Sequence, residues 1–392
     1  MYRKFQADHL FTGHTMLDRG EVLVMNNDEV VDIIPQAEAG SDIEVYNGIL
    51  SPGFINAHCH LELSHMKDRI KPGSGLVDFV HEVVTGRHAE EAEILQSIET
   101  LEKQMADSGI VAIGDICNNV TTLNQKRKRR LSYYNFIEAS GWLPSAAAQR
   151  FQRCIEILKS FSGSGLDAAI VPHAPYSVSD ELWNKIIPYF GNKIISIHNQ
   201  ETAFEDEFFL NGSGDFVRMY DLLNIDNTFF KPPQTSSLQS YFPRLARAKS
   251  IILVHNTFTK QEDIDFIKKQ DPGPLVSFCI CINANQYIEN AAPPVKMFIN
   301  NNCNIILGTD SIASNYNLNM VGEMTKIQQV YPETNLNEML GWATLNGAKA
   351  LGFQDTLGSF EKGKTPGVVL IENVVNHRLG PNSASRLLNT KP

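Results

Sequence analysis

The middle of the chain alternates short apolar runs with longer polar stretches. Eight apolar runs occur, at Ile49–Ala57, Gly109–Asp115, Leu131–Glu138, Leu166–Val171, Lys193–Ile197, Ser250–Val254, Leu275–Cys281 and Asn304–Gly308. Several polar stretches, such as Glu90–Met105, Gln149–Ser160 and Asp180–Tyr189, are amphipathic at helical spacing. Continuous apolar strands that alternate with helices indicate a parallel sheet covered on both faces. Eight such units predict an α/β protein with a (β/α)₈ barrel of the TIM type.

A doubly wound open sheet is the competing topology. That fold uses a glycine-rich phosphate loop after its first strand. No such loop follows Ile49–Ala57, and the barrel is therefore the favoured prediction.

The two ends of the chain have a different texture. Two β-branched runs flank Asn26-Asn27 and predict a hairpin, and Val368–Ile371 predicts a strand near the C-terminus. Neither end is apolar enough to form a core alone. We therefore expect residues 1–50 and 358–392 to form one small β-sandwich, with the barrel at 51–357 inserted between them. The stretch 205–247, rich in Phe, Asn, Gly and Pro, is longer than a connecting helix needs and suggests a lid.

Composition narrows the classes of partner. The chain has 34 Lys and Arg against 44 Asp and Glu, a net charge of −10, which disfavours nucleic acid and membrane surfaces. The one basic run, Lys126–Arg130, could be an anion patch. Because no aromatic residues interleave with it, a solvated helix end or loop is the favoured interpretation.

The cysteines and the N-terminal residues indicate a compartment. Six cysteines are scattered without a disulfide framework or a zinc-knuckle spacing. Neither a signal-peptide apolar segment nor 18 consecutive apolar residues occur. We expect a cytoplasmic protein with reduced, mostly buried thiols.

Polar residues that could carry chemistry follow the predicted strands. His58 and His60 come after the first strand, and residues i and i+2 of an extended segment project to the same side. His173, His198, His255 and Asp310 follow the fourth, fifth, sixth and eighth strands. Taken singly, each could be a buried structural histidine or, for Asp310, a helix N-cap. Their joint position at strand ends predicts an active site at the carboxyl end of the barrel.

The residue types suggest metal-assisted hydrolysis. His58, His60, His198 and Asp310 offer three nitrogens and one oxygen to a divalent ion, with room for water. Such an ion lowers the pKa of water toward about 7. Asp310 and His255 are placed to orient the resulting hydroxide, and Glu201, one turn past His198, is placed to protonate a leaving group.

Five motifs resemble the amidohydrolase superfamily, in particular the branch of heterocycle deaminases and triazine chlorohydrolases. The resemblance covers essentially the whole chain, and its motifs are, in chain order, Leu50–His60, Pro172–Ser177, His198–Glu201, Leu307–Ser311 and Ala343–Gly352. The resemblance implies a (β/α)₈ barrel that carries one divalent metal, Zn²⁺ by preference and Fe²⁺ as the alternative. Binuclear members have a carboxylated lysine at the end of the fourth strand, and Leu166–His173 contains none.

The resemblance also implies residue roles. His58, His60, His198 and Asp310 match metal ligands. Glu201 matches the proton-shuttling glutamate, His255 the histidine that positions water, and His173 a substrate contact.

Substrate contacts are less well marked. Glu62 in His60-Leu61-Glu62-Leu63-Ser64 could accept hydrogen bonds from a ring edge, or could be an ordinary first-turn glutamate. Ser311 and Asn285 are further candidates. Related chains tend to read Cys-Pro-x-x-Asn where this one has Ile282, which puts Asn283 and Asn285 in doubt. The Phe residues of the suspected lid, at 204, 208, 209, 229 and 230, could stack on a flat ring, although a core role is favoured.

The sequence therefore predicts a deaminase that hydrolyses an aminated, purine- or nucleoside-like or pterin-like heterocycle by attack of metal-bound hydroxide. A related hydrolase of C–Cl, substituted-amine or cyclic amide bonds is the first alternative, and a catalytically silent scaffold the second. The expected partner is this small molecule, with neither nucleic acid nor membrane, and a homodimer is the assembly that the resemblance suggests.

Overall fold

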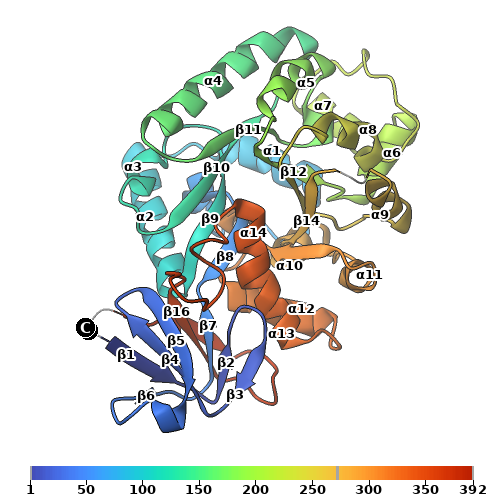
Figure 1. Ribbon diagram of the computed structural model, residues 1–392. Coiled ribbons are helices and arrows are strands. Elements are labelled where there is room, and N and C mark those ends of the chain that lie inside the picture. Colours follow the sequence, from blue (N-terminus) through green and yellow to red (C-terminus); the bar gives the residue numbers. More distant parts are fainter. Residues whose placement is uncertain (1, 271–272, 391–392) are drawn as a thin grey trace.

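The eight apolar runs form eight parallel strands in a computed structural model that describes residues 2–270 and 273–390 (Figure 1). The strands are β8 (Phe54–Cys59), β9 (Ile110–Cys117), β10 (Ser132–Ala139), β11 (Ala168–Pro172), β12 (Ile194–Asn199), β13 (Ser250–His255), β14 (Leu275–Ile280) and β15 (Asn304–Leu307). Most of their residues are buried, as expected for strands covered on both faces.

The strands pair in two half-barrels, in the orders β11-β10-β9-β8 and β12-β13-β14-β15. Backbone hydrogen bonds join the halves at both seams. The His198 amide donates to the His173 carbonyl over 2.9 Å, and the amides of Thr309 and Asp310 each donate to the His58 carbonyl over 3.1 Å. The predicted (β/α)₈ architecture is confirmed, and both seams lie among the predicted site residues.

Helices surround the strands (Figure 1). They are α1 (Leu76–Gly86), α2 (Glu91–Asp107), α3 (Leu123–Lys126), α4 (Ala147–Gly163), α5 (Asp180–Ile186), α6 (Ala203–Asn211), α7 (Phe216–Leu222), α8 (Ser237–Tyr241), α9 (Gln261–Lys268), α10 (Ile282–Glu289), α11 (Val295–Asn300), α12 (Met320–Val330), α13 (Leu336–Gly341) and α14 (Gly347–Leu351). In α4, Cys154, Ile157 and Phe161 recur at helical spacing and are buried, so this face packs on the strands.

The chain ends form two small sheets of four and five strands, ordered β5-β4-β1-β6 and β17-β16-β7-β2-β3. Their strands are β1 (Tyr2–Gln6), β2 (His9–Phe11), β3 (Met16–Asp18), β4 (Glu21–Asn26), β5 (Glu29–Pro35), β6 (Glu44–Val45), β7 (Ile49–Pro52), β16 (Val368–Glu372) and β17 (Ala384–Leu387). β4 and β5 are the expected hairpin, and β16 is the expected C-terminal strand, paired with β7. Residues from both ends, such as Leu23 and Leu370, share one core.

The first apolar run is divided between the two units. Its beginning is β7, in the small sheet, and its end is β8, in the barrel, with Gly53 between them. A side chain at Gly53 would lie 2.5 Å from the Pro366 carbonyl oxygen. The boundary expected at residue 50 therefore falls inside β7.

The stretch 205–247 is mostly helical rather than one long loop, since it includes most of α6 and all of α7 and α8. Phe208 and Phe216 are fully buried in an aromatic cluster that includes Trp142 and Tyr220. None of the five phenylalanines expected as core or stacking residues lines the large cavity at the barrel mouth. The core interpretation holds for Phe208 and Phe209, which are buried, but not for Phe229, which is 39% exposed.

The sequence suggested that the basic run Lys126–Arg130 is solvated, but the structure buries its first residue. The Lys126 side chain is fully buried and forms an ion pair with Asp115. Its ammonium group also donates to Asn135 Oδ1 over 2.8 Å. The other four residues of the run are exposed.

Among residues 2–270 and 273–390, none of the helices combines the length and the apolar character that crossing a membrane requires.

Candidate active site

His58 and His60 lie at the end of β8 and point toward Asp310, which follows β15. Nε2 of His60 lies 3.2 Å from both His58 Nε2 and Asp310 Oδ1, and His58 Nε2 lies 3.5 Å from the same carboxylate oxygen. Gly308 permits this approach, because a Cβ there would lie 2.9 Å from the Cβ of His58. The i, i+2 prediction is confirmed in its geometry.

His198 reaches the same point from β12. Its Nδ1 donates to the His173 backbone carbonyl over 2.8 Å. Because a carbonyl oxygen can only accept, this bond places the proton of the neutral ring on Nδ1. The lone pair of Nε2 is then available to a metal ion. Burial lowers the pKa of His58 and of His198 to about 3, so both imidazoles are neutral near pH 7.

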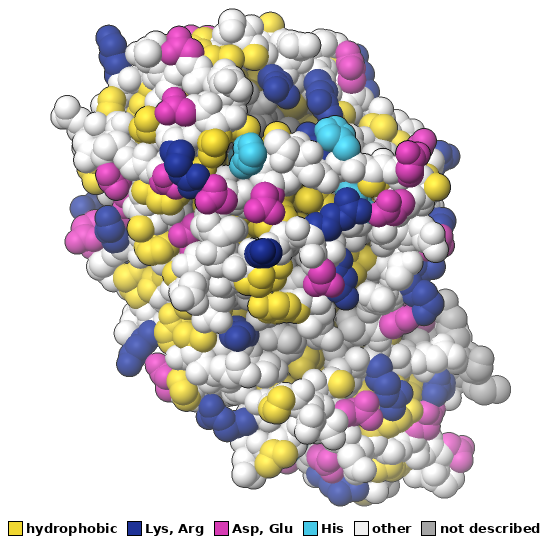
Figure 2. All heavy atoms as spheres, turned by 180° about the vertical axis from the view of Figure 1, so that it is seen from behind, with side chains coloured by type: hydrophobic (Ala, Val, Ile, Leu, Met, Phe, Trp, Pro, Cys, Tyr) yellow, Lys and Arg dark blue, Asp and Glu magenta, His cyan; other side chains and the backbone are white. Residues whose placement is uncertain are grey.

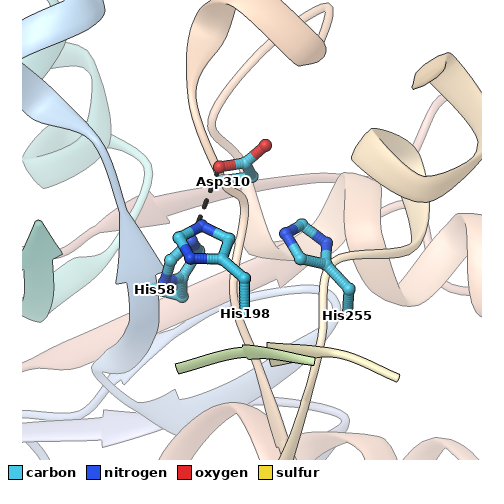
Figure 3. A group of neighbouring side chains, drawn as sticks. All are labelled: His58, His198, His255 and Asp310. Carbon is cyan, nitrogen blue, oxygen red and sulfur yellow. Dashed lines mark ion pairs between the residues drawn. The ribbon is translucent and has the colours of Figure 1, made fainter. Parts of the chain in front are cut away.

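This group of side chains fits a divalent cation. One ligand atom each from His58, His198, His255 and Asp310 lies within 4.8 Å of every other, and Figure 3 shows the four side chains converging. His60 contacts two members of the group directly. Buried neutral imidazoles that face one carboxylate are a donor set typical of zinc or iron.

His255 and Glu201 lie beside this cluster. Nε2 of His255 is 3.6 Å from Glu201 Oε1, and both side chains are buried. Burial raises the pKa of Glu201 well above its ordinary value, with Asp310 adding to the shift, and burial lowers the pKa of His255 to about 3. A carboxyl group that stays protonated near pH 7 can donate a proton.

The backbone is strained at this site. Gln200, His255 and Asp310 have φ angles of 45°, 72° and 58°, in the left-handed region that favours glycine. Such conformations cluster at functional sites, where the surrounding structure holds them.

A cavity of about 500 Å³ opens beside these residues. Three of the four residues predicted to contact substrate line it, namely Glu62, His173 and Ser311. The fourth, Asn285, does not. It is buried, hydrogen-bonds to Thr257 and contacts His255. Asn283 instead donates to Glu323 over 2.9 Å. The structure therefore places neither asparagine against the cavity.

Glu138, at the end of β10, lines the same cavity and was not predicted from the sequence. One of its oxygens accepts from Asn118 Nδ2 over 2.8 Å, and the other is buried without a hydrogen-bond partner among the described residues. The backbone amide of Asn118 donates to Glu62 Oε2 over 3.0 Å. Burial raises the pKa of Glu62 to about 7. Glu138 ends a predicted strand, so the strand-end rule that located the histidines could have found it.

Glu138, His173 and His198 form a second group of potential ligand atoms within 4.8 Å. The His198 Nδ1 proton is committed to the His173 carbonyl, however, and His173 Nδ1 lies 2.7 Å from Ser177 Oγ. His198 can therefore offer only Nε2 to a metal ion, and this atom belongs to the first group of ligand atoms. One metal ion is the number expected from the sequence.

Comparison with known proteins gives a consistent result. A model of the amidohydrolase family matches residues 49–385. The aminodeoxyfutalosine deaminase of Nitratiruptor sp. is 26% identical over 339 residues, which cover 83% of this chain and 79% of that protein. The adenosine deaminase of Helicobacter pylori is 26% identical over 328 residues, which cover 81% and 77%.

Solved structures share the fold. The aminofutalosine deaminase of Helicobacter pylori superimposes with a TM-score of 0.81 and 21% identity, covering 100% of this chain and 99% of that chain. An atrazine chlorohydrolase from Arthrobacter aurescens, complexed with zinc, gives a TM-score of 0.73 at 14% identity, covering 99% and 96%.

Proposed function

Because this chain belongs to the amidohydrolase family, we propose that it is a metal-dependent aminohydrolase that removes the amino group of a nucleoside-like heterocycle as ammonia. The observation that carries the proposal is the convergence of His58, His198, His255 and Asp310 beside the buried Glu201 at the mouth of one large cavity. Curated relatives named as deaminases of adenosine-type compounds support the choice of leaving group and ring.

We assign the metal to His58, His60, His198 and Asp310, with Zn²⁺ as the ion. Two observations support this set. His58 Nε2 and His60 Nε2 both face Asp310 Oδ1, and two solved structures with bound zinc share the fold. Iron is the alternative, because it accepts the same nitrogen and oxygen ligands. When bound, the ion supplies Lewis acidity and lowers the pKa of water toward about 7.

The chain's own residues supply proton transfer and orientation. Burial raises the pKa of Glu201, which favours its protonated form, and we assign Glu201 to deliver the proton to the departing nitrogen. His255, 3.6 Å from Glu201, orients the attacking oxygen and the tetrahedral carbon centre. His173, fixed by Ser177, presents its other ring nitrogen to the ring of the substrate.

Glu62, Glu138 and Ser311 complete the cavity wall. Carboxylates joined through Asn118 present hydrogen-bond acceptors, which suit the N–H and O–H groups of an aminated nucleoside. We place the enzyme in the cytoplasm, where its six free cysteines would stay reduced.

Ammonia release from a panel of adenosine, 5′-deoxyadenosine, guanine, cytosine and pterin derivatives tests the proposal. The expected result is stoichiometric ammonia from at least one adenosine-type compound. A second function, hydrolysis of a C–Cl bond, is favoured only by the structural similarity to the chlorohydrolase. Chloride release from chlorotriazines without ammonia release from any panel member would replace our proposal with that one.

A further inference from the structure

The chain turns sharply after β12, directly before the residue assigned as the general acid. β12 ends at Asn199, and Gln200 has a φ angle of 45°. This left-handed conformation is unfavourable for a residue with a side chain, so the surrounding structure must hold it. Glu201 follows at once, and its Oε1 lies 3.6 Å from His255 Nε2. The turn at Gln200 therefore sets the direction in which Glu201 projects.

The Glu205 side chain holds the backbone of this turn. Its Oε1 accepts from the Gln200 amide over 3.0 Å, and its Oε2 accepts from the Glu201 amide over 3.3 Å. These amides belong to the two peptide groups that flank the strained residue. Successive N–H groups in such a turn form a concavity that binds oxyanions. Glu205, in the first turn of α6 and with 0% of its surface exposed, supplies the oxygen pair from the chain itself.

A network of polar groups anchors Glu205 behind the active site. Many Asp and Glu side chains lie on the surface, as Figure 2 shows for one face, whereas this one is enclosed. Ser237 Oγ, of α8, donates to Glu205 Oε1 over 2.6 Å, and the Ser237 amide donates to Asp206 Oδ1 over 3.0 Å. Asp206 also accepts from Gln200 Nε2 over 3.1 Å. Helices α6 and α8 therefore bind both the backbone and the side chain of the turn.

Glu205 lies outside the cavity wall. The wall includes Glu201 and His255 but not Glu205, so Glu205 can affect the reaction only through other residues. A general acid has to lie within hydrogen-bond reach of the atom that it protonates. A displacement of about 1 Å can lower the rate by about 10²-fold. Fixing the two peptide groups beside Glu201 therefore matters for turnover as well as for folding.

We infer that Glu205 is a positioning residue, which binds the amides on both sides of the Gln200 turn and thereby holds Glu201 at the departing nitrogen. The inference rests on the proposed function, because it takes Glu201 to be the group that protonates this nitrogen. It extends the active site beyond the cavity wall, to the first residue of the segment 205–247 that the sequence suggested as a lid.

Glu205→Gln tests this role with the least change in shape. Gln keeps one acceptor oxygen and replaces the other by an NH₂ group, so only one of the two amides retains its acceptor. For ammonia release from 5′-deoxyadenosine, kcat should fall about tenfold to a hundredfold, with KM within about threefold of wild type. Metal content of the same sample should be unchanged, since the bonds of Glu205 run to Gln200, Glu201 and Ser237 rather than to the assigned ligands.

A double-mutant cycle separates positioning from a general loss of structure. If Glu205 acts through Glu201, E205Q has little left to affect once the acid is gone, so E201Q/E205Q should turn over within about threefold of E201Q. The matched control is Glu102→Gln, because Glu102 of α2 is equally buried, accepts from Tyr133 over 2.8 Å and does not line the cavity. E102Q should keep kcat within about twofold in either background.

Two kinetic results would overturn the inference. One is a kcat of E205Q within about threefold of wild type. The other is an equal loss from E205Q in the wild-type and E201Q backgrounds, because a structural defect adds to the loss of the acid whereas a positioning defect does not.

Hydrogen exchange judges the inference without turnover. Amides of the peptide that covers residues 199–203 should exchange faster in E205Q than in wild type or E102Q, because one of them has lost its acceptor. Unchanged exchange there would also overturn the positioning role. Absence of ammonia from every compound of the panel, together with faster exchange in E205Q, would count against the deaminase and leave Glu205 as the residue that holds this turn.

Discussion

Glu201 is the residue on which proton transfer depends. Its carboxyl group is buried 3.6 Å from His255, and burial raises its pKa, which favours the protonated form. Glu201→Gln should therefore retain the metal and lose turnover by roughly 10²–10⁴-fold, the usual range for general acid–base groups. Steady-state ammonia release, with metal content measured on the same sample, checks this.

The matched control is Glu207→Gln, which removes an exposed carboxylate six residues further along the chain and should leave turnover unchanged. Glu201→Gln with activity within tenfold of wild type would show that another group delivers the proton.

Lys126 is a buried cation with a structural role. Lys126→Met would leave Asp115 charged and buried without its partner, at a cost of about 3–5 kcal/mol of unfolding free energy. Asp115 also accepts from the Leu61 amide over 2.8 Å, next to His60. Urea denaturation measures the loss, and Lys128→Met, whose ion pair with Glu99 is exposed, should cost about 1 kcal/mol or less. Equal effects of the two substitutions would contradict this role.

Glu205 predicts a pH dependence of stability. Burial raises its pKa to about 8, against an ordinary value near 4.5. An acid with a raised folded-state pKa contributes stability that is fully present below the unfolded pKa and is lost as the pH rises through the folded pKa. The contribution of Glu205 should thus fall between about pH 4.5 and 8, with a slope of up to about 1.4 kcal/mol per pH unit.

Unfolding free energies at pH 5 and pH 8 test this dependence. Glu205→Gln should lower stability at pH 5, because the Glu201 backbone amide donates to Oε2, and the NH₂ group that replaces this oxygen in Gln cannot accept that bond. The variant should show a smaller loss between the two pH values than wild type. An unchanged difference between pH 5 and pH 8 would show that Glu205 does not titrate in this range.

The residues found from sequence and those missed differ in a simple way. His58, His60, His198 and Asp310 could be predicted, because strand ends on one side of a parallel barrel converge whatever the loops do. Lys126 was misinterpreted, because its burial depends on Asp115 and Asn135 from two other strands. Such pairing is set by tertiary contacts and leaves no local pattern.

At the scale of elements, the helices α6 and α7 form a packed part of the barrel mouth. Phe208 is fully buried, and its ring stacks on Phe230 with centroids 4.4 Å apart. Phe208→Ala should lower the free energy of unfolding by about 3–5 kcal/mol, the usual cost of such a core deletion. Thermal or urea denaturation, with activity on the same sample, measures this.

Phe229→Ala is the control, because that side chain is 39% exposed, and its cost should be about 1 kcal/mol or less. Nearly equal effects of the two substitutions would mean that this segment is not packed as described, and would revive the expectation of a lid.

Element existence was more predictable than element boundaries. All eight barrel strands were predicted from the sequence, because a strand of a parallel sheet is buried on both faces and therefore appears as a continuous apolar run. The division of the first run between β7 and β8 was not found, because an apolar run carries no mark of where it passes from one sheet to another. Gly53 was the only local signal.

At the scale of the whole molecule, the chain joins a barrel that carries the site to an acidic overall charge. The net charge of −10 disfavours the binding of polyanions at long range. The sandwich formed by both chain ends lies below the barrel in Figure 1 and supplies no cavity-lining residue.

Titration of metal-free enzyme with Zn²⁺, followed by ammonia release, tests the central claim most directly. Activity should rise linearly and reach a plateau at one equivalent, and His198→Ala should bind no metal and release no ammonia. Full activity of the metal-free enzyme, or a plateau at two equivalents, would contradict the account.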